Sequence, residues 1–169
     1  IHDMDKEESF TSTLDDSDHK MKIYISTPTE PNFGIEIRYK ATSMAKWFIN
    51  CSSCFEDFEM NSQYFFETGI RELGYIRESD GAERIFICPN CGAEITPMDK
   101  QARGRWIHAQ PAMKRHNRFG FNFSNMILPH ITADVAYQDY LDFIVKPKGL
   151  KKFYNEKLGE PKTDDERNA

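Results

Sequence analysis

Apolar and polar side chains alternate in several short stretches of the chain. A period of two residues is typical of a strand whose two faces have different surroundings. Residues 20–26 and 119–125 alternate in this way, and the further stretches that we expect to be strands are residues 46–50, 55–60, 74–77, 83–87 and 105–108. Pro28 and Pro31 end the region of the first strand, because proline continues neither a strand nor a helix.

Apolar side chains recur at helical spacing nearer the end of the sequence. Residues 133–145 carry a wide apolar stripe at this spacing, and Thr132 precedes them as an N-cap. A second helix is expected over residues 150–158, where Gly159 ends it. Shorter helices are expected over residues 5–18, 33–42 and 97–103, residues 61–73 should be helical or irregular, and residues 161–169 should be loose.

All four cysteines lie in two Cys-x-x-Cys motifs: Cys51, Cys54, Cys88 and Cys91. Two such turns supply the four ligands of a tetrahedral zinc site, so we predict a zinc ribbon with one structural zinc per chain. Pro89 and Gly92 favour a tight second turn, and Asn50 or the serines must shape the first. The alternatives are disulfides, a thioredoxin-like redox pair and a catalytic zinc enzyme such as a deaminase, which would need a His-x-Glu motif that this sequence lacks.

The composition indicates a hydrophobic core that is too small to stabilise the fold by itself. Of the 169 residues 39% are hydrophobic, and the mean hydropathy is −0.67. A metal or a partner domain would supply the missing stabilisation. The sequence contains no long apolar run and no signal-peptide pattern, so we expect a cytoplasmic protein, and a start at Ile1 suggests part of a longer chain.

The net charge of −5 conceals an uneven distribution. Residues 1–18 are mostly acidic, whereas residues 100–118 contain only basic charges: Lys100, Arg103, Arg105, Lys114, Arg115 and Arg118. A basic segment that also contains Trp106 is a candidate surface for DNA phosphates, and a solvated loop is the alternative. We expect Trp47 and Trp106 to pack the small core of the ribbon.

Several short motifs follow one another in a characteristic order. They are Ser26-Thr27-Pro28-Thr29, residues 47–54 around the first cysteine pair, residues 88–95 around the second, Gly104-Arg105-Trp106, residues 119–123 and residues 153–161. In this order and spacing, residues 20–161 resemble the central part of a tailed-phage terminase large subunit of the zinc-binding, lambda-type branch.

The resemblance implies part of an ATP-driven motor that packages double-stranded DNA. The portal and the small terminase subunit would be its partners, an oligomer would be compatible with it, and no membrane would be involved. Ser26, Thr27 and Pro28 would correspond to the motif that couples ATP hydrolysis to movement. The sequence contains no Gly-rich phosphate loop and stops before the nuclease carboxylates, so ATP and Mg would act only in a complete parent, and this chain should be inactive alone.

We therefore expect an α+β fold: a zinc ribbon with short antiparallel strands between an ATPase remnant and a helical connector. The expected regions are the end of the α/β ATPase domain (1–45), the zinc ribbon (46–108), a basic strand and helical connector towards a nuclease domain (109–160) and a tail (161–169). The alternative is a stand-alone zinc-ribbon module that binds nucleic acid or regulates another protein.

Overall fold

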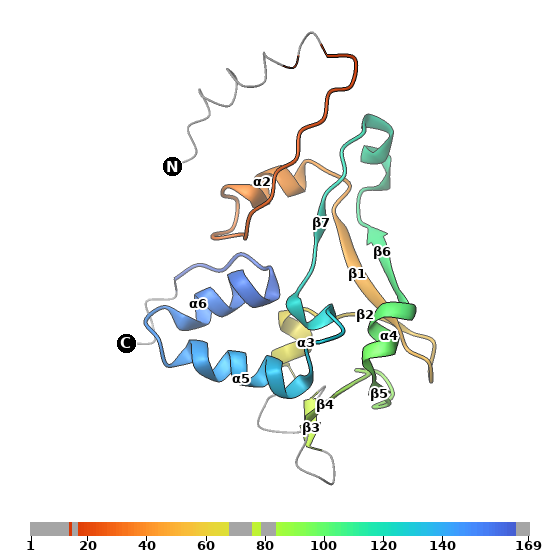
Figure 1. Cartoon of the computed structure of the whole chain (residues 1–169), viewed down its shortest axis with the longest axis vertical. Coiled ribbons are helices and arrows are strands. Elements are labelled where there is room, and N and C mark those ends of the chain that lie inside the picture. Colours follow the sequence, from red (N-terminus) through yellow and green to blue (C-terminus); the bar gives the residue numbers. More distant parts are fainter. Residues whose placement is uncertain (1–13, 15–16, 68–75, 79–83, 165–169) are drawn as a thin grey trace.

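The computed structural model describes residue 14 and residues 17–67, 76–78 and 84–164. It is a mixed α+β fold with two small sheets and several short helices (Figure 1). Predictions for residues 1–13, 15–16, 68–75, 79–83 and 165–169 lie outside the described residues. Among the described helices none is long and apolar enough to cross a bilayer.

The larger sheet is built around strand β1 (Ala45–Asn50). Strands β2 (Asp57–Glu59) and β6 (Gly104–His108) pair with β1 in antiparallel directions, and the short strand β7 (Phe121–Asn122) pairs with its beginning in parallel. Ala45 and Ile49 of β1 are fully buried, which is expected for a strand with neighbours on both edges. The predicted strands at 46–50 and 105–108 are confirmed, and residues 57–59 of the predicted strand at 55–60 form β2.

The smaller sheet has the order β3 (Ile76–Glu78), β4 (Arg84–Ile87) and β5 (Glu94–Ile95), all antiparallel. Its strands β3 and β4 match the predicted strands at 74–77 and 83–87 within the described residues. The second cysteine turn joins β4 to β5, and the first joins β1 to β2. Each cysteine pair therefore lies at the tip of a hairpin from a different sheet.

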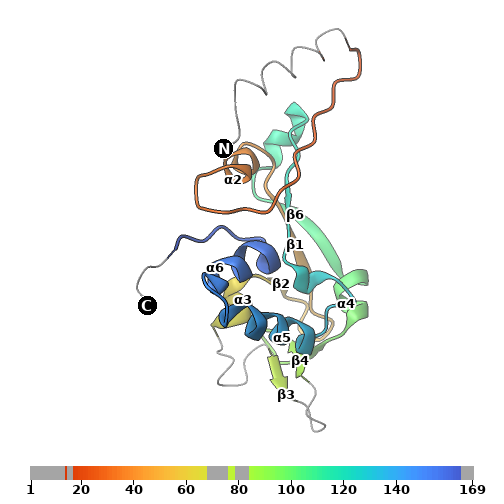
Figure 2. The ribbon, with the colours of Figure 1, turned by 60° about the vertical axis from the view of Figure 1, so that its left-hand side comes forward.

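The helices are short and gather mainly at one end of the larger sheet. They are α2 (Ile35–Lys40), α3 (Ser62–Phe66), α4 (Pro97–Ala102), α5 (Ala133–Ile144) and α6 (Gly149–Phe153), with 3-10 turns η1 (Pro111–His116) and η2 (Asn125–Ile127) and a π-helical turn η3 (Tyr154–Leu158). Two views show α3, α5 and α6 around one end of β1, while its other end extends towards α2 (Figure 1, Figure 2). The Thr132 hydroxyl caps α5 by accepting the Val135 N–H at 3.2 Å, as predicted.

One hydrophobic core joins the hairpins to these helices. Its buried members include Ile49, Phe65 and Phe153 as well as Cys51 and Cys88. Phe65 lies 5.1 Å from Phe153 between ring centroids, so the helix after the first hairpin packs directly on the last helix. The core therefore spans regions that the sequence assigned separately to a ribbon and a connector.

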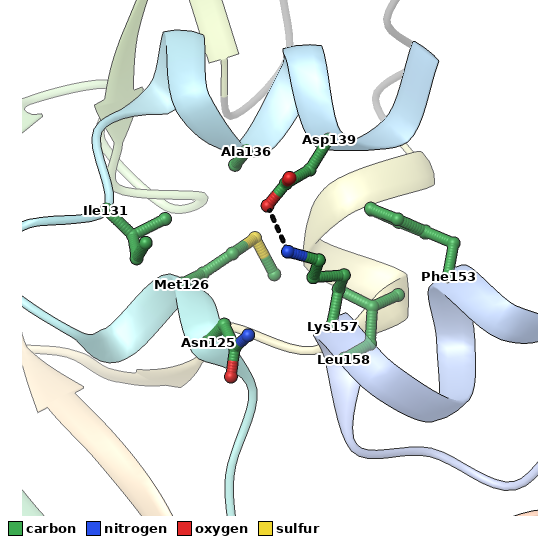
Figure 3. A pocket seen from close by; sticks show the side chains of 8 residues that line it. All are labelled: Asn125, Met126, Ile131, Ala136, Asp139, Phe153, Lys157 and Leu158. Atoms are coloured by element: carbon green, nitrogen blue, oxygen red, sulfur yellow. Dashed lines mark ion pairs between the residues drawn. The ribbon is translucent and has the colours of Figure 1, made fainter. Parts of the chain in front are cut away.

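A small cavity of about 10 Å³ lies between η2, α5 and η3 (Figure 3). Asp139 of α5 and Lys157 of η3 form an ion pair of 2.8 Å across its lining. This volume is at the lower limit for a single water molecule. The cavity is a packing feature and does not accommodate a ligand.

Two predicted strands are wrong or too long. Residues 20–26 have no regular structure, and Met21, Ile23 and Ile25 are 74%, 68% and 92% exposed, because no described strand lies beside them to complete a ladder. Of residues 119–125, only Phe121 and Asn122 pair with β1. The strand ends because the Ser124 hydroxyl turns inward and donates to the Met60 carbonyl before η2 begins.

Candidate metal centre

The two cysteine turns have the same backbone hydrogen bonds. In each turn the carbonyl of the first cysteine accepts a hydrogen bond from the N–H four residues later: from Phe55 to Cys51 at 3.0 Å, and from Gly92 to Cys88 at 2.9 Å. The N–H of the first cysteine donates to the carbonyl five residues later, which is that of Glu56 at 2.9 Å in the first turn and that of Ala93 at 2.7 Å in the second. The two hairpin tips are thus repeated copies of one local structure.

A left-handed residue follows the second cysteine in each turn. Gly92 has φ +73°, as its predicted role requires, and Phe55 has φ +62° in the equivalent place. A phenylalanine adopts this conformation at a cost of roughly 1–2 kcal/mol. Asn50 supports the strained turn through its side-chain amide, which donates to the Phe55 carbonyl at 2.7 Å, so the prediction for Asn50 was correct but omitted Phe55.

The hairpin tips bring all four thiols together. The four Sγ atoms lie within 4.8 Å of one another, with 3.7 Å between Cys51 and Cys91 and 3.7 Å between Cys54 and Cys88. None of these cysteines is in a disulfide. Sulfurs at roughly 2.3 Å from a tetrahedral ion lie about 3.8 Å apart. The donor set and its spacing therefore fit a tetrahedral thiolate-binding metal ion.

The thiols differ in their surroundings. Cys51 and Cys88 are buried, Cys54 is half-buried and Cys91 is exposed. Burial raises the pKa of Cys88 to about 12. Hydrogen bonds from the Asn90 side chain and then from the Glu56 backbone lower the pKa of Cys54 to about 6. A bound cation favours the thiolate form of every ligand, so metal binding releases protons from this cluster.

Arg103 supports the first turn instead of facing solvent. Its Nε donates to the Asn50 carbonyl at 2.9 Å, and its Nη2 donates to the Asn50 Oδ1 at 2.8 Å and to the Cys51 carbonyl at 3.4 Å. The guanidinium therefore holds the backbone of the first turn at Asn50 and Cys51. Sequence reasoning assigned Arg103 to a DNA surface, because the distant partner Asn50 leaves no signal at residue 103.

The other basic residues predicted to contact DNA differ in burial and in their partners. Lys100 is 2% exposed, and its ammonium donates to the Ile131 carbonyl at 2.7 Å and lies 4.1 Å from the Phe86 ring centroid, so it belongs to the core. Arg105 is exposed and forms an ion pair with Asp57. The remaining three are exposed near or within η1: Lys114, Arg115 and Arg118.

The remaining sequence candidates lie away from the cysteine cluster. Ser26 and Thr27 are exposed in the irregular segment before α2, while Pro28 is buried. Trp47 and Trp106 are paired across β1 and β6 with ring centroids 5.1 Å apart, and Trp47 packs against the core. Gly104 leaves room for the Trp47 ring, since a Cβ at residue 104 would lie 2.0 Å from that ring.

The fold and the cysteine cluster define a small α+β protein whose two hairpins form a candidate metal centre. A family model described as the phage terminase large subunit gpA, ATPase domain, matches residues 11–106, which is more than half of the 169 residues. The chain therefore belongs to the phage terminase large subunit gpA family, as the resemblance indicated. The matched residues include all four cysteines. No curated protein and no solved structure matches the chain.

Proposed function

We propose that the chain is the zinc-braced region of a DNA-packaging terminase large subunit, between its ATPase and nuclease domains. The observation that carries this proposal is the set of four Sγ atoms with two 3.7 Å separations, in a chain that belongs to the terminase family. The proposed ligands of one zinc ion are Cys51, Cys54, Cys88 and Cys91. Four thiolates fill a tetrahedral shell and leave no position for water or substrate, so the role is structural.

The zinc would join the two small sheets at their hairpin tips, in addition to the hydrophobic core that both sheets share. One ligand pair comes from the β1–β2 hairpin and the other from the β4–β5 hairpin. The metal would fix these hairpins as one rigid body beside the ATPase. The parent protein would use ATP and Mg, with Ser26, Thr27 and Pro28 as candidates for the coupling motif, and would meet the portal and the small terminase subunit.

The exposed basic residues at η1 are the proposed contacts to double-stranded DNA. Lys114, Arg115 and Arg118 are exposed, and none of the ion pairs found among the described residues includes them. An available cluster of this kind attracts phosphates and releases counterions when it binds them. The surface is therefore smaller than the sequence predicted, since Lys100 and Arg103 are bound within the fold.

Salt-dependent duplex binding tests this proposal. Changing Lys114, Arg115 and Arg118 together to Ala should weaken binding and reduce the slope of log K against log salt by about 2 to 3, because each phosphate contact contributes about 0.9. A matched variant with Lys146, Lys148 and Lys152 changed to Ala removes the same charge near α6 and should keep the slope. Equal slopes for both variants would reject η1 as the duplex contact.

A further inference from the structure

Three phenylalanines alternate along the segment that contains β7. Phe119, Phe121 and Phe123 are 52%, 52% and 46% exposed, which is high for aromatic side chains next to a core. They follow η1 directly, so the rings begin next to the exposed Lys114, Arg115 and Arg118. Neither the candidate metal centre nor the duplex contact uses these rings.

The rings lie on a rigid support. Phe121 pairs with Ala45 of β1, and the Ala45 N–H donates to the Gly120 carbonyl at 2.7 Å. The Trp106 ring contacts Phe121 and Phe123 edge-on, with centroids 5.0 and 6.2 Å away. The sheet therefore holds these two rings in place and leaves part of each accessible.

The first ring adjoins the positive charge. The Arg118 carbonyl accepts the Ser43 N–H at 3.0 Å, which anchors the backbone one residue before Phe119. Phe119 has no ring contact among those found in the described part of the chain, and at 52% it is as exposed as Phe121. Cations beside accessible rings on a fixed backbone form the combination that binds single-stranded nucleic acids.

We propose that this aromatic row, Phe119, Phe121 and Phe123, binds the bases of an unpaired DNA strand whose phosphates contact Lys114, Arg115 and Arg118. The proposal rests on the proposed function, because it takes DNA as the ligand of the η1 cations, and it adds that the strand is unpaired. Alternate residues of an extended chain lie about 7 Å apart. Bases in a duplex stack at about 3.4 Å, so the row suits bases that are spread apart and does not suit an intact duplex.

Binding of two labelled oligonucleotides to the zinc-loaded chain tests this assignment. The probes are an unstructured single strand and a duplex of the same length, and fluorescence anisotropy measures the affinity of the chain for each. The chain with Phe119 and Phe123 changed to Ala should lose at least tenfold in single-strand affinity, because stacking on an aromatic ring contributes roughly 5- to 150-fold per base. Its duplex affinity should change less than twofold.

Two further variants separate stacking from apolar contact and from folding. Changing both residues to Leu keeps apolar volume without a π face and should lose affinity as Ala does, whereas changing both to Trp should restore it. Zinc content and circular dichroism report the folding of each variant. The single change Phe119→Ala, which removes no ring contact in the described structure, provides the same test if the double variant does not fold.

The outcomes distinguish this proposal from the proposed function. Equal affinity of the wild type for both probes, with no effect of the ring variants, would overturn the aromatic row and leave duplex binding by the η1 cations intact. Wild-type affinity in the Leu variant would overturn it too, since an apolar face for a protein partner would then remain. Absence of binding to either probe would overturn both proposals.

Discussion

At the scale of single residues, the burial of Lys100 determines how stability depends on pH. Desolvation lowers its pKa from 10.5 to about 8 in the folded chain. Between these values the unfolded chain holds a proton that the folded chain has lost. The free energy of unfolding therefore rises with pH across this interval, because the unfolded state binds more protons there.

The variant Lys100→Met isolates this effect. From pH 7 to pH 9.5 the free energy of unfolding of the wild type should increase by about 2 kcal/mol relative to the variant. Urea unfolding at several pH values, with zinc present throughout, measures the difference. A difference between the two proteins that stays constant with pH would show that Lys100 has an ordinary pKa in the folded chain.

At the scale of elements, the first cysteine hairpin depends on a side chain from the end of another helix. Arg103 follows α4 and makes three hydrogen bonds to Asn50 and Cys51. Removing such a support from a metal ligand typically costs 10- to 100-fold in metal affinity. Arg103→Ala should therefore release zinc to a competing chelator at least tenfold more readily than the wild type.

Arg105→Ala is the matched control for this prediction. Arg105 lies two residues away, and its side chain is 62% exposed in the ion pair with Asp57, so the loss of the pair should change metal affinity less than twofold. Both variants remove one guanidinium from the same strand region. Equal zinc affinity in the two variants would show that the Arg103 hydrogen bonds do not support the metal turn.

The elements that were predictable are those whose signal is local. The helix at 133–145 follows from periodicity, the strand at 46–50 from an apolar run that leads into Cys51, and the cysteine cluster from ligand spacing. The segment 20–26 alternates as a strand does, but periodicity does not supply a neighbouring strand. The left-handed backbone of Phe55 was foreseeable, because Phe55 occupies the position after Cys54 that Gly92 occupies after Cys91.

The basic segment shows what periodicity cannot predict. Lys100 and Arg103 are charged residues of the kind that usually lies on a surface. In the structure the Lys100 ammonium enters the core, and the Arg103 guanidinium supports a turn. Their partners Ile131 and Asn50 are distant in sequence, at 31 and 53 residues. Only the three-dimensional structure could separate these residues from the exposed cations at η1.

At the scale of the whole molecule, the proposed zinc couples the two sheets through one core. Cys51 and Cys88 are both ligand candidates and core residues, so loss of the metal would disturb packing as well as the hairpin tips. Cys88→Ser should abolish tight zinc binding and unfold the region from β1 to β6, because the free energy of zinc binding also stabilises the fold.

Hydrogen exchange measures this prediction directly. Amides of β1, β4 and β5 should lose protection in Cys88→Ser, while Ser52→Ala, a change in an exposed turn residue, should keep both protection and zinc. Native circular dichroism and native protection in the cysteine variant without bound metal would show that the fold does not depend on the ion.

X-ray absorption at the zinc edge of the purified chain tests the central claim most directly. The proposed site predicts one zinc per chain with four sulfur neighbours at roughly 2.3 Å and no nitrogen or oxygen in the first shell. Cys91 is exposed and lies outside the buried core, unlike Cys88, so Cys91→Ser should keep a weaker zinc site. Loss of one sulfur scatterer in that variant would identify the shell as that of the two hairpins. A wild-type spectrum with fewer than four sulfurs, or a folded chain that binds no zinc, would contradict the account.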